Sequence, residues 1–149
     1  MKIDLDIFKK KEVERIIKTD KAKYILLTLW ELLLMGCVVY IQYFLRAKET
    51  AYSYTETFLL GTLPSLFGAA AFVSVLFIYH KIYTMLSGRY KLRHSIIFSF
   101  VFTFFGFLLW EIIRMGLYPF DKYDILMTFA GCVISVVLII VLFGRDLEK

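Results

Sequence analysis

The chain has 149 residues, of which 60% are hydrophobic, and its mean hydropathy is +0.70. Soluble domains are closer to half apolar, so the composition excludes an ordinary soluble domain and indicates that lipid covers much of the surface. The formal net charge of +5 comes from basic residues that mostly flank the apolar stretches. That distribution is typical of contact with lipid headgroups rather than with nucleic acid.

Four apolar segments are long enough to cross a membrane as helices. Each has roughly 19 to 22 residues, a length that spans a hydrocarbon core of about 30 Å at about 1.5 Å rise per residue. The strict alternation of a barrel strand is not found in any of them. The sequence therefore predicts an all-α integral membrane protein, a four-transmembrane-helix bundle. The expected spans are residues 24–45, 58–79, 95–113 and 125–143.

Basic residues are distributed unevenly between the two sides that such a bundle defines. Eight Lys and Arg residues precede the first span, two lie in the first loop, four in the loop 80–94, two in the third loop and two at the end. One side therefore carries fourteen and the other four. The positive-inside rule then predicts that both termini are cytoplasmic and that the chain is a multi-pass protein of the cell (inner or plasma) membrane.

Residues 1–23 form a basic juxtamembrane segment ahead of the membrane domain, residues 24–149. Apolar residues recur in this segment at three- to five-residue steps. One prediction is an amphipathic helix that lies on the cytoplasmic leaflet with its lysines toward the headgroups. The other is a solvated, partly helical tail.

The first span contains one carboxylate, Glu31, beside Trp30. Burying a charge in the bilayer costs on the order of 2.5 to 3.5 kcal/mol on insertion scales, so such a residue faces the bundle, is paired or is protonated. Glu31 is therefore a functional candidate. A hydrogen bond to a Ser or Thr of a neighbouring span is the structural alternative.

Small residues recur at three- and four-residue spacing in the second, third and fourth spans. They let helix backbones approach closely, which is a main source of cohesion in lipid. Pro64 has a second interpretation as the first-turn proline of the membrane helix, with residues 54–61 a separate turn or re-entrant piece. The residues expected to pack helices are Gly61, Pro64, Gly68, Ser99, Gly106, Thr128 and Gly131. The stripe of the third span that is expected to face the other helices consists of Ser95, Ser99, Thr103, Gly106 and Trp110.

Residue types that bind metals or catalyse reactions are sparse. Cys37 and Cys132 lie within spans, where thiols usually behave as small hydrophobes. His80 and His94 have no spacing typical of metal ligands. The sequence contains no HExxH, nucleophile elbow or phosphate loop. We expect no metal, no cofactor and no catalytic residues, which favours a protein that is not an enzyme without excluding one.

Four ionisable residues crowd between the third and fourth spans, on the side with few basic residues. These candidate ligand-binding residues are Glu111, Arg114, Asp121 and Asp124. Glu111 and Arg114 are three apart and can pair on one helix face. Asp121 or Asp124 can instead cap the next helix, where an acidic residue is favoured by the helix dipole. A polar site at the outer surface would suit a cationic or hydroxyl-rich headgroup.

Short motifs accompany these charges. Glu111 follows Trp110 near the end of the third span, and the acidic pair of residues 121 and 124 leads into a helix that contains Gly131. This order resembles the VanZ-like family of small bacterial membrane proteins, as does Leu63-Pro64 with Gly68 in the second span. The resemblance covers about residues 58–140.

The chain departs from the family pattern at three positions. Arg114 stands where a Gln is common, Thr128 replaces the usual Asn, and Tyr118 stands in place of an Arg. The resemblance implies a protein of the bacterial cell envelope, and the founding member of the family is associated with resistance to the glycopeptide teicoplanin.

The function expected from these features is binding of a lipid-linked or cell-wall component at the external polar cluster. One alternative is a non-catalytic subunit of a larger membrane protein complex, because the small-residue stripes offer more packing surface than a lone bundle needs. Another is a small proton-coupled transporter that uses Glu31. The expected partners are membrane lipids, and a larger complex or further copies of the chain, but not nucleic acid.

Overall fold

The computed structural model describes residues 14–15, 18, 20–48, 52–116 and 121–144. Within these ranges the chain is all-helical, and four of its helices are long and apolar enough to cross a membrane, which confirms the predicted class. Most of the segment 1–23 lies outside the described residues, and so does Tyr118. The elements are α2 (Lys21–Tyr40), the π-helix η1 (Ile41–Leu45), α3 (Tyr54–Leu86), α4 (Leu92–Arg114) and α5 (Lys122–Phe143).

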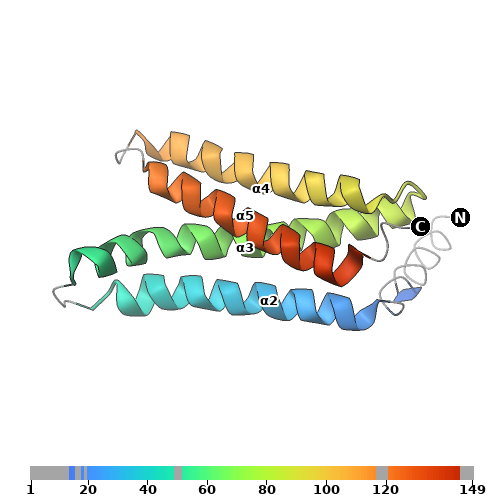
Figure 1. The fold of residues 1–149 in the computed structure, drawn as a ribbon, viewed down its shortest axis with the longest axis horizontal. Coiled ribbons are helices and arrows are strands. Elements are labelled where there is room, and N and C mark those ends of the chain that lie inside the picture. Colours follow the sequence, from blue (N-terminus) through green and yellow to red (C-terminus); the bar gives the residue numbers. More distant parts are fainter. Residues whose placement is uncertain (1–13, 16–17, 19, 49–51, 117–120, 145–149) are drawn as a thin grey trace, which may run out of the picture.

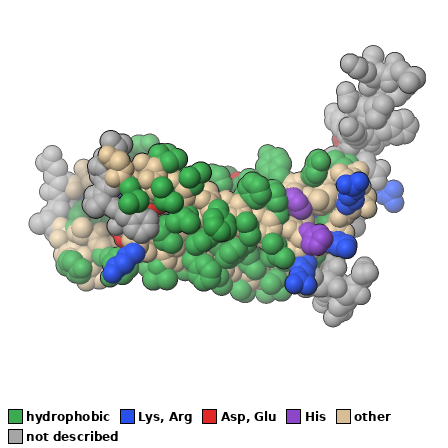
Figure 2. Space-filling model, turned by 90° about the horizontal axis from the view of Figure 1, so that it is seen from above, with side chains coloured by type: hydrophobic (Ala, Val, Ile, Leu, Met, Phe, Trp, Pro, Cys, Tyr) green, Lys and Arg blue, Asp and Glu red, His purple; other side chains and the backbone are tan. Residues whose placement is uncertain are grey.

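The second spanning helix, α3, is the centre of the bundle and contacts each of the others. Figure 1 shows α2 and α4 on opposite sides of α3, and the backbones of these two helices do not approach each other closely among the described residues. The start of α2 and the end of α5 lie at the same end, where the rings of Tyr24 and Phe143 are 5.8 Å apart. Figure 2 shows an apolar band around the middle and most of the visible Lys, Arg and His side chains at that end.

The helix α3 extends beyond its apolar segment at both ends. It begins with a capping box, in which Ser53 Oγ accepts the Glu56 N–H at 3.3 Å and Glu56 Oε2 accepts the Ser53 N–H at 2.8 Å. This reciprocal pair satisfies backbone donors that a helix start leaves free. Pro64 consequently lies inside one continuous helix, and the prediction of a separate turn over residues 54–61 is wrong.

Pro64 has no N–H, so the carbonyl of Leu60, four residues earlier, lacks its usual partner in the helix. Arg46 provides a replacement from the end of η1. Its Nε donates to the Leu60 carbonyl at 2.8 Å, and its Nη2 donates to the carbonyls of Leu60 and Gly61, the latter at 2.9 Å. Gln42 Oε1 accepts from Arg46 Nη1 at 2.9 Å and so orients the guanidinium. The first connection is thereby tied to the proline site of α3.

The backbones of α3 and α5 pass close to each other at Gly131. A Cβ added there would lie 2.2 Å from the carbonyl oxygen of Leu66, so only glycine fits. About one turn later, Ser135 Oγ donates to the Ala70 carbonyl at 2.7 Å and accepts from Trp30 Nε1 at 3.1 Å. Ser135 therefore joins α5 to both α3 and α2.

Lys81 is buried at the end of the bundle where α2 begins. It is 1% exposed and lies within α3, so its assignment to the loop 80–94 is wrong. Its Nζ is 3.2 Å from Asp20 Oδ2 and 3.8 Å from the ring centroid of Phe143, which compensates the buried charge. Burial raises the pKa of Asp20, but the hydrogen bond from Lys23 and the charge of Lys81 outweigh it and hold that pKa below its usual range.

Candidate functional site

The four candidate binding residues meet where α4 ends and α5 begins. Arg114 Nη2 donates to Glu111 Oε1 at 2.9 Å and to Asp124 Oδ2 at 3.1 Å, so the guanidinium lies between two carboxylates from different helices. The backbone N–H of Asp121 donates to Glu111 Oε1 at 3.3 Å. We call these four residues the polar cluster.

The two aspartates of the polar cluster have different roles. Asp121 is the N-cap of α5, and its Oδ1 accepts the N–H of Tyr123 at 2.8 Å. Asp124 is buried and accepts from Ser65 Oγ at 2.9 Å in addition to its bond with Arg114. The capping interpretation therefore describes Asp121, whereas Asp124 attaches the cluster to α3.

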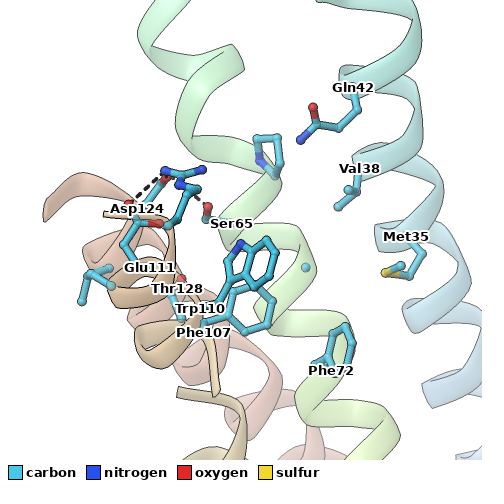
Figure 3. A pocket seen from close by; sticks show the side chains of 14 residues that line it. Met35, Val38, Gln42, Ser65, Phe72, Phe107, Trp110, Glu111, Asp124 and Thr128 are labelled. Carbon is cyan, nitrogen blue, oxygen red and sulfur yellow. Dashed lines mark hydrogen bonds and ion pairs between the residues drawn. The ribbon is translucent and has the colours of Figure 1, made fainter. Parts of the chain in front are cut away.

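A cleft of about 260 Å³ opens beside the polar cluster. It lies between α2 and α4, whose backbones stay apart within the described residues, with α3 between them. Figure 3 shows Gln42 and Met35 of α2 on the far side of α3 from Glu111 and Asp124. All four spanning helices contribute to its lining, α5 through Asp124, Ile125 and Thr128.

Some polar atoms of the polar cluster make no hydrogen bond to any described residue. Glu111 is 4% exposed, and only its Oε1 has hydrogen-bond partners among the described residues. Arg114 Nε is buried and likewise has no partner in the described part of the chain. A buried polar group without a partner costs about 1–3 kcal/mol. These atoms are the acceptor and the donor that a ligand in the cleft would satisfy.

The polar cluster combines three carboxylates with one guanidinium, so its formal charge is negative. Across the described ranges, no three His, Cys, Asp or Glu side chains are grouped to hold a metal ion. Arg114 occupies the position between Glu111 and Asp124 where a cation would bind. The arrangement suits a ligand that brings an ammonium or hydroxyl group to the carboxylates and an acceptor to the guanidinium.

The residues expected to pack helices fall into two groups. The buried ones are Pro64, Gly68, Ser99, Thr128 and Gly131. Gly61 and Gly106 are exposed, and outside their own helix no described atom lies within 4 Å of an added Cβ.

The buried polar face of α4 differs from the stripe seen in the sequence. The buried polar residues of this helix are Ser95, Ser99, Thr103 and Glu111. From Thr103, two four-residue steps lead through Phe107 to Glu111, whereas Gly106 and Trp110 are one position earlier and lie on the exposed side. The inner face of α4 therefore ends in the polar cluster.

Glu31 is half-buried on the face of α2 that also carries Leu27 and Leu34. The structure shows no hydrogen bond or ion pair of Glu31 with any described residue, so the alternative of a bond to a Ser or Thr of another span is not seen there. Met35, one turn later on the same side, lines the cleft. Glu31 thus lies beyond the inner end of the cleft and apart from the polar cluster.

Two polar residues of the site are not singled out as site residues by the sequence. Gln42 is an amide near the end of the first span, and its polarity within a membrane segment is a signal that could have identified it. Ser65 matches the small-residue spacing of α3, and its bond to Asp124 joins residues 59 positions apart. No local pattern indicates that contact.

The described residues therefore contain four apolar helices and one cleft in which a net-negative polar cluster meets apolar walls. No protein-family model, curated protein or solved structure matches this chain.

Proposed function

We propose that this chain is a VanZ-like protein of the bacterial cell envelope that binds a lipid-linked or cell-wall component at the polar cluster. The observation that carries the proposal is the assembly of Glu111, Arg114 and Asp124 beside a cleft, at the end of the bundle away from the buried Lys81. The glutamate and the acidic pair are also residues on which the family resemblance depends. Ionisable residues in membrane segments are costly, so their convergence on a cleft favours a binding role.

The proposed orientation has both termini in the cytoplasm and the cleft open to the outside. It is supported by the excess of Lys and Arg on the side of the chain ends, fourteen against four. The start of α2 and the end of α5 share one end of the bundle, as two termini on one side of a membrane require.

Thiol labelling in intact cells tests this orientation. Met115 is 53% exposed just beyond α4, and Ser87 is exposed just beyond α3 at the opposite end. In a chain with Cys37 and Cys132 replaced by Ala, a membrane-impermeant maleimide should label Met115→Cys in intact cells and Ser87→Cys only after lysis. The reverse pattern would place the cleft in the cytoplasm and remove the proposal.

Susceptibility to teicoplanin and to other envelope-directed agents tests the binding role. A deletion and Glu111→Gln should shift susceptibility in the same direction, because Gln keeps the size of the side chain and removes its charge. Glu56→Gln is the matched control, since Glu56 is an exposed carboxylate at the same end of the bundle that does not line the cleft. Unchanged susceptibility in both the deletion and Glu111→Gln contradicts the proposal.

A second candidate function, proton-coupled transport, is favoured by Glu31. This half-buried carboxylate near the middle of the first span has no polar partner in the described residues, so it is free to exchange a proton for a cationic substrate. Proteoliposomes with a pH gradient should then accumulate tetraphenylphosphonium, and Glu31→Gln should abolish the uptake while Glu111→Gln retains it. Absence of accumulation by the unmodified protein eliminates this candidate.

A further inference from the structure

An apolar groove of about 450 Å³ continues from the cleft along α3 and α4. Cleft and groove share three lining residues, Phe72 of α3 and Phe107 and Trp110 of α4, which Figure 3 labels. The two spaces therefore adjoin, and we call them together the hollow, which has the polar cluster at one end and apolar walls over the rest. Leu76 and Phe102 line its far part.

The length of the hollow matches one leaflet of a bilayer. Arg114 and Phe102 lie twelve positions apart on α4, which corresponds to about 18 Å at 1.5 Å rise per residue. One leaflet of the hydrocarbon core is about 15 Å deep, half of about 30 Å. A hollow that begins at the membrane surface and ends near the bilayer middle follows the course of one acyl chain.

Gly106 leaves this groove open. It lines the groove, and apart from its own helix no described atom lies within 4 Å of where its Cβ would stand. A larger side chain at this position would extend into the groove rather than into a neighbouring helix. A substitution at Gly106 can therefore fill part of the groove.

A buried hydroxyl in the groove wall has no partner. Thr103 is 3% exposed, lines the groove, and its Oγ1 makes no hydrogen bond to any described residue. Neither water nor lipid tails can readily satisfy a hydroxyl at this depth. Arg114 Nε is a second buried donor without a partner among the described residues, at the polar end of the hollow.

We propose that the hollow binds one zwitterionic phospholipid, with its phosphate at Arg114, its ammonium at Glu111 and one acyl chain in the apolar groove. A phosphate is a preferred partner of a guanidinium, and the excess of carboxylates selects a cationic head over an anionic one. This inference rests on the proposed function, because the polar cluster is the same binding site.

Native mass spectrometry of the purified full chain in detergent tests the inference. The probes are phosphatidylethanolamine, phosphatidylglycerol, which lacks the ammonium, and diacylglycerol, which lacks the headgroup. We expect the first to bind most tightly, by about tenfold, which corresponds to about 1.4 kcal/mol. Glu111→Gln should reduce its preference over phosphatidylglycerol.

Filling the groove provides the decisive variant. Gly106→Leu should weaken phosphatidylethanolamine binding about tenfold, and Gly106→Ala, which changes the packing less, should give an intermediate loss. Gly36→Leu is the matched control, because Gly36 is an exposed glycine of α2 that lines neither space and has no described neighbour within 4 Å.

Two results overturn the inference: equal binding of the three lipids by the unmodified protein, or binding that survives both Gly106 substitutions. The outcome is separable from that of the proposed function. If the protein binds lipid selectively but neither the deletion nor Glu111→Gln changes susceptibility to envelope-directed agents, the inference stands and the proposed function is removed. An envelope phenotype of Glu111→Gln with unchanged lipid binding leaves the proposed function and removes the inference.

Discussion

Replacing Arg46 by Met removes the side chain that satisfies the carbonyl released by Pro64. Arg46 makes three hydrogen bonds to the carbonyls of Leu60 and Gly61, and a hydrogen bond from a charged donor is worth about 1.5–3 kcal/mol net. Because these bonds share two acceptors, we expect a loss of about 2–3 kcal/mol in the free energy of unfolding rather than their sum. Met keeps most of the aliphatic length, so the loss reports on the guanidinium.

The double substitution isolates the reason for that loss. In Pro64→Ala, an N–H at residue 64 can bond the Leu60 carbonyl within α3, so removal of Arg46 should then cost about 1 kcal/mol or less, a coupling of about 1–2 kcal/mol. The assay is unfolding in mixed micelles with increasing SDS fraction, followed by tryptophan fluorescence. Lys48→Met, an exposed position nearby, should change stability by less than about 0.5 kcal/mol. Equal costs of Arg46→Met with and without the proline would refute this account.

The same unfolding assay addresses three more expectations. Gly131→Ala should cost about 1–3 kcal/mol because its Cβ overlaps a carbonyl of α3, whereas Gly36→Ala should be neutral or stabilising by up to about 1 kcal/mol; equal effects would argue against the close helix approach. Ser135→Ala should cost about 1–3 kcal/mol, since it leaves the indole N–H of α2 without an acceptor; an unchanged midpoint would contradict the bridge. The pKa of Asp20 is lowered in the folded protein, so its ion pair with Lys81 should contribute fully above the unfolded-state pKa of about 3.9 and be lost as pH falls below it. Asp20→Asn should therefore lower stability at pH 7 and flatten its dependence on pH below about 4; an unchanged acid dependence would exclude this carboxylate as the cause.

The number and class of the spanning helices follow from the sequence alone. A lipid environment requires every backbone polar group to be satisfied within the segment, so an apolar run of about 20 residues has one solution, a helix. The ends of α3 do not follow in the same way. They depend on the capping box at Ser53 and on the burial of Lys81 against Asp20 and Phe143, and hydropathy registers neither because both use polar residues.

Part of the candidate site is also local. Glu111 and Arg114 are three positions apart, and helical periodicity alone places them on one face. The bond of Ser65 to Asp124, the position of Gln42 across the cleft and the separation of α2 from α4 depend on how whole helices pack. Helix packing in lipid is selected by close backbone contact, as where Gly131 meets Leu66, and by interhelical hydrogen bonds such as those of Ser135. Such contacts join residues more than sixty positions apart, so only the tertiary structure decided which side of α3 stayed open and which polar groups lined it.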